Sequence, residues 1–200
     1  MVGSGYWETV QVFHDTLQAA IARVTQAILL VDGPFPPDEM SGRLRVSEIK
    51  AALGRPASNR ALSLAMRFRV TANTSGEDRW EIQTFAYSYL LFRDDREEVG
   101  YHWDDEAVIG IQTPHVHFGK DLAHTGLPRV DRDRLGTLAA AHLPTGLVPF
   151  TQILRAAIRN LGVEPLRRQG ESIEEARAAA ERSFREAEAA LSSSFAWWKG

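Results

Sequence analysis

The N-terminal part of the chain carries apolar residues at helical spacing. Between residues 7 and 31 they recur every three or four positions, which places them on one face of an α-helix. Asp32, Gly33 and Pro34 then supply turn residues and a residue that cannot continue a helix. The pattern therefore predicts an N-terminal amphipathic helix over residues 7–31. Its apolar positions are Val10, Phe13, Leu17, Ala20, Val24, Ile28 and Val31.

The period changes to two in the region 42–118, which is the spacing of half-buried β-strands. Turn-forming clusters separate the runs, first at residues 73–78 and then at Asp94, Asp95 and Arg96. Neighbouring runs joined by such short turns are typical of hairpins. The predicted strands are residues 62–71, 80–92, 98–103 and 114–118.

Helical spacing returns in the last quarter of the chain. It predicts a short helix over residues 148–161 and a longer one over residues 172–193, where Ser172 and Glu175 form a capping box. The apolar stripe of the last helix is rich in Ala, so it can approach another helix closely, either the N-terminal helix or a partner chain. The chain is thus predicted to be a single α+β domain over residues 1–200. Its mainly antiparallel sheet of four or more strands is covered by helices, with long N-terminal and C-terminal amphipathic helices.

Composition narrows the classes of function. The net charge is −3 and the isoelectric point is near 6.1, so any nucleic-acid contact must be local. The chain has no cysteine, which excludes disulfides, thiolate nucleophiles and Cys-ligated zinc. Neither a secretory leader nor an apolar run of about 18 residues is present. We therefore expect a soluble cytoplasmic protein that does not contact a membrane.

Five of the six histidines lie between residues 102 and 142. His115 and His117 are separated by one residue, so on a strand both leave the same face, and His102 joins them if its strand pairs with theirs. Such a group suits acid–base catalysis of phosphoryl or acyl transfer. It also suits metal ligation with a nearby carboxylate, or a structural role. Because no further ligands follow at fixed spacing, we predict no metal and no cofactor. His14, His124 and His142 are interpreted as boundary or solvated residues.

One basic stretch runs from residue 43 to residue 69, and it contains six arginines but a single acid, Glu48. Arg67 and Arg69 are the candidate substrate-binding residues, because guanidinium groups can neutralise a phosphate. Residues 46–62 can also be interpreted as a helix-turn-helix whose recognition helix begins at Ser58, Asn59 and Arg60. The other interpretation of this basic stretch is a solvated strand face.

Several short motifs resemble poorly characterised bacterial proteins related to the TumE toxins of toxin-antitoxin systems. The resemblance covers about residues 80–166. It implies a small α+β fold with a His-bearing sheet, a toxin or defence role and RNA cleavage, with His102, His115 and His117 as the site. Asp104 and Asp105 stand where the resemblance leads us to expect a further His and Pro. The motifs are Tyr87-Ser-Tyr-Leu-Leu, Val99-Gly-Tyr-His-Trp, Pro114-His-Val-His-Phe-Gly and His142-Leu-Pro-Thr-Gly.

Two functions remain open from the sequence. The first is a toxin-like or defence-associated ribonuclease that uses His102, His115 and His117 for metal-independent RNA cleavage, with Arg67 and Arg69 on the phosphate. The second is a non-catalytic protein- or DNA-binding module of such a system. It would contact a cognate antitoxin, another protein or a second copy of the chain through its terminal helices. Three aromatic residues near the C-terminus, Phe195, Trp197 and Trp198, are candidates for the same role.

Overall fold

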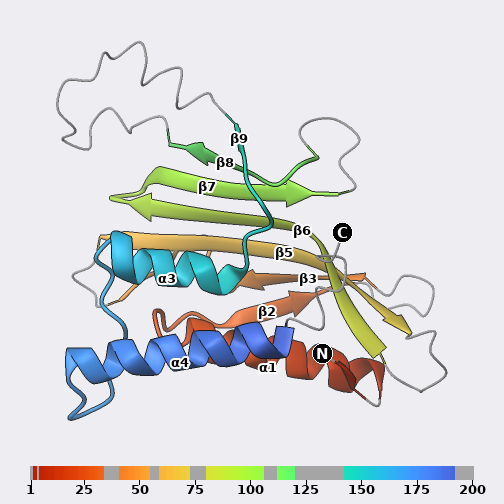
Figure 1. Ribbon diagram of the computed structural model, residues 1–200, viewed down its shortest axis with the longest axis horizontal. Helices are drawn as coiled ribbons and strands as arrows, with labels where there is room; N and C mark the ends of the chain where they lie inside the picture. The colour runs from red at the N-terminus through yellow and green to blue at the C-terminus, as the bar shows by residue number, and fades with distance from the viewer. Residues whose placement is uncertain are drawn as a thin grey trace.

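The computed structural model describes residues 2–3, 5–33, 41–54, 59–72, 80–105, 112–119 and 142–191. Their strands form one nine-stranded sheet in which every pair is antiparallel, and their helices lie on one side of it (Figure 1). The predicted α+β class is confirmed. The main path through the sheet runs β2 (Leu29–Asp32), β3 (Ser41–Val46), β5 (Arg60–Ala72), β6 (Trp80–Arg93), β7 (Arg96–Asp104), β8 (His115–Phe118) and β9 (Leu143–Pro144). The short strands β1 (Val2–Gly3) and β4 (Ala51–Ala52) pair with β6 and β5, respectively.

The centre of the sheet is the hairpin-like pair β5 and β6, with 13 and 14 residues. The alternation predicted for β5 is confirmed, because its apolar positions are almost completely buried and the intervening ones are partly or fully exposed. The turn predicted for residues 73–78 lies outside the described residues. The buried positions are Leu62, Leu64, Met66, Phe68 and Val70.

Strands β6 and β7 meet at the two-residue turn Asp94–Asp95, whose φ angles are +47° and +63°. When both central residues of a two-residue turn have positive φ, the twist of the turn matches the twist of the two antiparallel strands that it joins. The Asn59 side chain donates a 2.9 Å hydrogen bond to the Asp94 carboxylate, which holds this end of the sheet. The tight turn predicted at this point is therefore confirmed.

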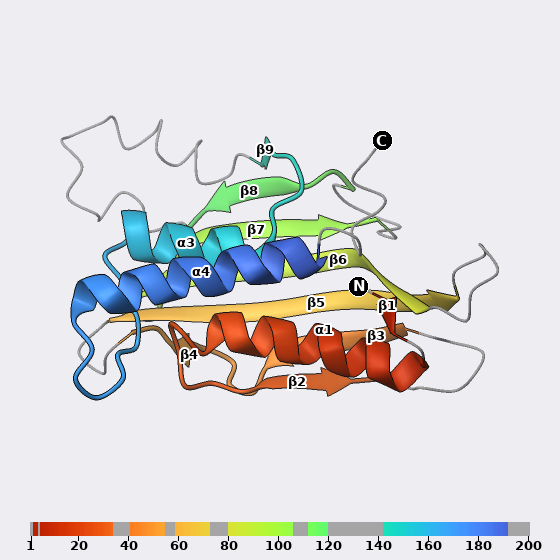
Figure 2. The ribbon, with the colours of Figure 1, turned by 60° about the horizontal axis from the view of Figure 1, so that its bottom comes forward.

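Three helices cover one face of the sheet: α1 (Tyr6–Ile21), α3 (Phe150–Asn160) and α4 (Ile173–Leu191) (Figure 2). The capping box predicted for the last helix is present. The Glu175 backbone N–H donates to Ser172 Oγ at 3.2 Å, and the Ser172 N–H donates to the Glu175 carboxylate at 2.8 Å. The helix α3 ends shortly before Gly162. This residue has a φ of +71°, the left-handed conformation that commonly ends a helix.

Helices α1 and α4 pack against each other within the chain. The Ser183 hydroxyl donates a 3.2 Å hydrogen bond to the Ala19 carbonyl, which needs the close approach that small side chains allow. Phe184, at 1% exposure, completes the buried stripe of α4. The apolar faces of the two terminal helices are therefore used inside the protein. The Ala residues of that stripe are Ala176, Ala179, Ala180 and Ala187.

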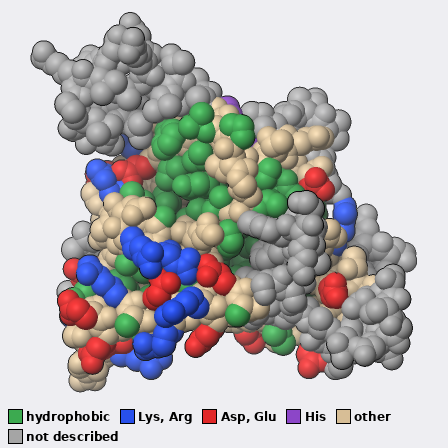
Figure 3. Space-filling view, in the orientation of Figure 1, with side chains coloured by type: hydrophobic (Ala, Val, Ile, Leu, Met, Phe, Trp, Pro, Cys, Tyr) green, Lys and Arg blue, Asp and Glu red, His purple; other side chains and the backbone are tan. Residues whose placement is uncertain are grey.

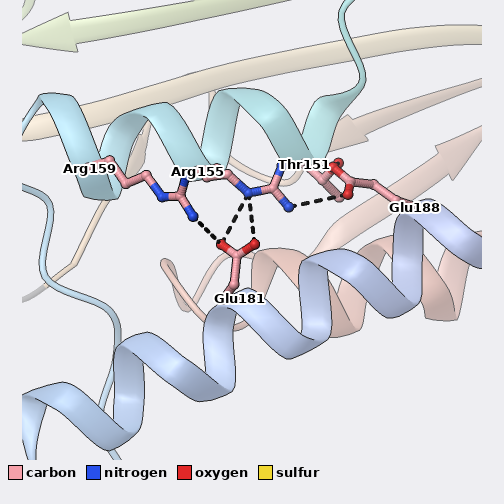
Figure 4. A network of polar contacts seen from close by, with 5 residues as sticks. All are labelled: Thr151, Arg155, Arg159, Glu181 and Glu188. Carbon is pink, nitrogen blue, oxygen red and sulfur yellow. Dashed lines mark hydrogen bonds and ion pairs between the residues drawn. The ribbon is translucent and has the colours of Figure 1, made fainter.

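A charged network joins α3 to α4 (Figure 4). The Arg155 guanidinium donates to both oxygens of Glu181 at 3.1 Å and to Glu188 Oε1 at 2.8 Å. Arg159 adds a 3.2 Å bond to Glu181, and the Thr151 hydroxyl adds a 2.8 Å bond to Glu188. Because one guanidinium binds two carboxylates, the register between the helices is well defined.

The predicted N-terminal helix over residues 7–31 is wrong from residue 22 onward. The helix ends at Ile21, residues 22–24 form a turn, and residues 29–32 are the strand β2. The carbonyls of Arg23 and Val24 accept hydrogen bonds from the Leu166 and Gly54 backbone N–H groups, so tertiary contacts replace the next helical turn. Apolar spacing of three and four continued past the true end because Val24 is buried in a turn.

The helix-turn-helix interpretation of residues 46–62 is also wrong. Residues 47–50 are bends, Ala51–Ala52 is the strand β4, and β5 already begins at Arg60. From Arg60 onward, the segment predicted as a recognition helix is instead a β-strand. The described residues of this segment therefore do not form the recognition helix that this interpretation requires. The described residues do not include His124, the C-terminal aromatic residues Phe195, Trp197 and Trp198, or helix positions 192–193. Among the described residues, no helix combines the length and hydrophobicity needed to cross a membrane.

Candidate functional site

The histidine cluster is built by the register of β7 and β8. His102 faces His115 directly across this strand pair, and Gly100 faces His117. Directly paired residues of antiparallel strands project to the same face, and residues two apart do so as well. The three predicted site residues therefore share the sheet face opposite Trp103, which is buried in the core.

Four imidazole rings come together at this point. The ring centroids of His102 and His117 are 4.7 Å apart, and those of His102 and His115 are 5.8 Å apart. His142, immediately before β9, adds the fourth ring at 4.9 Å from His115 and 5.8 Å from His117. We refer to His102, His115, His117 and His142 as the His cluster. The sequence predicted the grouping of the first three but placed His142 among solvated residues.

Two of these rings have a polar partner at Nδ1. His115 Nδ1 lies 2.9 Å from the Thr113 carbonyl, and His117 Nδ1 lies 3.1 Å from Glu97 Oε1. Because the Thr113 carbonyl can only accept, the Nδ1 of His115 is the donor and its Nε2 is left as an acceptor in the neutral ring. The Glu97 carboxylate also stabilises His117 when that ring takes up a proton.

Gly100 gives the His117 ring its position. A Cβ atom at residue 100 would lie 2.5 Å from His117 Nε2 and 2.9 Å from Leu90 Cδ2, closer than side-chain carbons ever approach such atoms. The imidazole therefore lies across the backbone of β7, in space that only glycine leaves open. A sequence signal for this contact existed, since Gly100 stands between Glu98 and His102 on the polar face of the strand.

The environment of the cluster disfavours protonation of its inner rings. Burial, together with the neighbouring rings of His117, His115 and His142, lowers the pKa of His102 to about 4. Burial also lowers the pKa of His117, although the Glu97 carboxylate opposes that shift. His102 is therefore neutral at pH 7 and cannot serve as a proton donor there. His142 is the exposed member of the cluster.

The relative orientation of the imidazole planes decides whether two rings of the cluster can bind the same metal ion. An imidazole holds a metal ion in the plane of its own ring, whereas His102 and His117 stack with only 10° between their planes. These two rings cannot share one ion in this arrangement. Within the part of the chain that the structure describes, no group of three or more His, Cys, Asp or Glu side chains is placed to hold a metal ion.

A groove of about 740 Å³ leads to the cluster along the sheet face opposite the helices. His102 and His115 line one end, and Arg43 and Arg67 line it further along. Small side chains, Ala65 and Ala86 among them, belong to the same lining. We refer to this feature as the sheet groove.

The two predicted substrate-binding arginines lie beside the sheet groove. The guanidinium groups of Arg67 and Arg69 contact the ring of Phe85, at 4.6 and 4.7 Å from its centroid. Arg67 also forms an exposed ion pair with Asp104 at 3.3 Å. The structure thus brings Arg67 into one groove with His102 and His115, while Arg69 reaches that groove through Phe85.

Comparison of the chain with protein-family models, with curated proteins and with solved structures found no match.

Three residues of the site were missed from the sequence. His142 could have been found from the density of histidines between residues 102 and 142. Glu97 could not, because a register shift between β6 and β7 at Leu91/Phe92 interrupts the simple alternation of faces. The third is Gly100.

Proposed function

We propose that the protein is a ribonuclease that cleaves RNA without a metal ion, using the His cluster for acid–base chemistry. The observation that carries the proposal is the convergence of four imidazoles at the end of an arginine-lined groove. Two rings in one site can remove a proton from the attacking group and return one to the leaving group. Guanidinium groups beside them can hold the phosphate and offset its charge.

His117 is the general base in this proposal. Its Nδ1 lies 3.1 Å from the Glu97 carboxylate, which favours the imidazolium that forms on proton uptake. His117 Nε2 removes the proton of a ribose 2′-hydroxyl, whose oxygen then bonds to the adjacent phosphorus. The bond from phosphorus to the 5′-oxygen of the next nucleotide breaks. The products are a 2′,3′-cyclic phosphate and a 5′-hydroxyl end.

His142 is the general acid. It is the exposed member of the cluster, and its ring lies 5.8 Å from that of His117, close enough for both to reach oxygens of one phosphodiester. His142 gives its proton to the departing 5′-oxygen. His102 and His115 line the end of the sheet groove and position the nucleotide there. The low pKa of His102 is the reason for assigning the acid role to His142 instead.

The toxin or defence setting of this activity rests on the sequence resemblance to TumE-related proteins. A cognate antitoxin and a cytoplasmic location belong to the same proposal. The alternative, a non-catalytic module acting through its terminal helices, has less support. The apolar stripe of α4 is buried and α1 packs against α4, so these faces are not available to a partner in this conformation.

The test is cleavage of a mixed RNA pool in EDTA by the wild type, His117→Ala and His14→Ala. General acid–base catalysis contributes roughly 10²–10⁴-fold to a rate, so His117→Ala is expected to lose activity by that factor. His14 lies on α1 beside Asp15, outside the cluster, and its variant is the matched control that keeps full activity. RNA left intact by the wild type, or cut equally by His117→Ala, overturns the proposal. Cleavage that appears only after zinc or manganese is added contradicts the metal-independent mechanism.

A further inference from the structure

The sheet groove has the size and lining of a site for nucleic acid. It takes residues from β2, β3, β5, β6, β7 and β8, six neighbouring strands. Five strand spacings of about 4.8 Å give a path of about 24 Å across the sheet. That length accommodates a few nucleotides of an extended strand, which is more than the chemistry at one phosphodiester requires.

The floor and the rim of the groove differ in character. Ala65 and Ala86 offer small apolar surface, whereas charged groups of both signs lie along the lining, namely Arg43, Arg67, Asp32 and Asp104. Arg43 and Arg67 face each other directly in the pairing of β3 with β5, so two guanidinium groups lie on the same side of the sheet. Small apolar side chains beside two cations leave room for a base next to its phosphate.

These features discriminate between nucleic-acid forms. In a duplex the bases face each other and are shielded by the backbone, so they cannot reach a sheet floor, whereas an unpaired strand can turn its bases toward protein. The Phe85 ring, already stacked with the Arg67 and Arg69 guanidinium groups, is part of this surface. The whole chain carries a net charge of −3, so affinity must come from these few local cations.

We infer that the sheet groove binds single-stranded RNA in preference to duplex RNA, with Arg43 as a phosphate-binding residue in addition to Arg67 and Arg69. The inference rests on the proposed function, because it names the substrate form for the same site. On binding, a phosphate takes the place of the Asp104 carboxylate beside Arg67. Three phosphate contacts on a single strand correspond to a salt dependence of log K with a slope of about −2.

The experiment measures fluorescence anisotropy of a labelled eight-nucleotide RNA with the cleavage-deficient His117→Ala variant. The same sequence is also presented as a duplex. Single-stranded RNA is expected to bind at least tenfold more tightly than the duplex. Adding Arg43→Gln is expected to reduce the magnitude of the salt slope by about 0.7, which is one phosphate contact. Arg185→Gln, an exposed position on α4, removes the same charge from the helix side and is expected to leave the slope unchanged.

The outcomes distinguish a failure of the inference about the sheet groove from a failure of the proposed ribonuclease function. Equal binding of both forms, no binding, or a slope insensitive to Arg43→Gln overturns the inference about the groove. If the wild type still cleaves RNA in that case, the proposed ribonuclease function stands and only the groove assignment is wrong. Selective binding of the single strand by a protein that never cleaves RNA contradicts the ribonuclease and supports the groove.

Discussion

The two faces of the sheet use their polar groups for different purposes. On the helix face, apolar side chains of β5 and β6 are buried. Basic and acidic side chains lie side by side over the helices (Figure 3), and Arg155 pairs with Glu181 and Glu188 (Figure 4). On the opposite face, His102 is held in a setting that disfavours its own protonation. Charges that are matched contribute to the fold, whereas an imidazole whose pKa is shifted away from its usual value is characteristic of functional sites. The difference predicts that substitutions on the two faces separate stability from activity.

The largest effect on stability is expected from the helix face. Phe184 on α4 is 1% exposed and belongs to the main core. Replacing Phe184 with Ala removes buried apolar surface and leaves a cavity, which typically costs about 3–5 kcal/mol. Chemical denaturation measures the loss. Arg43→Gln on the open face is expected to stay within about 0.5 kcal/mol of the wild type. Equal losses in the two variants would contradict the division between the faces.

Gly100→Ala tests the sheet face that carries the His cluster. The added methyl group collides with the far end of the His117 side chain and with Leu90, both of which can move without disturbing the backbone. We expect RNA cleavage to fall tenfold or more while the melting temperature changes little. Gly146→Ala is the matched control, since a Cβ there meets no atom within 4 Å. Unchanged cleavage by Gly100→Ala would show that the ring position of His117 is not needed.

The His cluster also predicts how stability depends on pH. In the unfolded chain His102 titrates near 6.5, whereas in the folded protein burial holds its pKa at about 4. The unfolded state therefore binds this proton first as the pH falls, so the free energy of unfolding decreases between pH 6.5 and pH 4. Because the ring is partly exposed, the loss is on the order of 1–2 kcal/mol. Denaturation of the wild type and of His102→Gln at several pH values measures it, and the variant is expected to show a smaller slope. Identical slopes would be inconsistent with this assignment.

The smallest effect is expected at Glu97. Its carboxylate raises the pKa of His117 against the larger lowering by burial. Glu97→Gln removes that charge, so the pKa of His117 falls further. As a general base His117 must be neutral, and activity is lost below its pKa, so the acidic limb of the rate profile moves to lower pH by less than about one unit. A limb that moves to higher pH, or does not move, would contradict His117 as the base. The measurement is the initial cleavage rate between pH 4 and pH 8.

The sequence predicts those parts of this structure in which the local pattern and the tertiary environment agree. The alternation in β5 and the capping box of α4 are local features, and the fold retains both. The strand at residues 29–32 was missed because its residues also continue a helical spacing, and only backbone contacts from Gly54 and Leu166 end the helix earlier.

In the candidate site, too, local sequence patterns could be predicted and contacts made by the tertiary fold could not. His102, His115 and His117 could be placed together because strand periodicity and one pairing assumption were sufficient. His142 reaches them through the pairing of β9 with β8, a contact between distant parts of the chain that periodicity does not encode. Glu97 depends on a register shift, which is a property of two strands together.

The contact between α1 and α4 also constrains when the fold can be completed during synthesis. Ser183 and Ala19 are separated by 164 positions in the chain. At synthesis rates of about 5–20 residues per second, roughly 8–33 s pass between the emergence of one helix and that of its partner. Until then α1 lacks the helix beside it, and contacts of such long range are the slowest to form. A nascent chain on the ribosome therefore has an incomplete helix layer behind the sheet that carries the histidines until α4 has been translated.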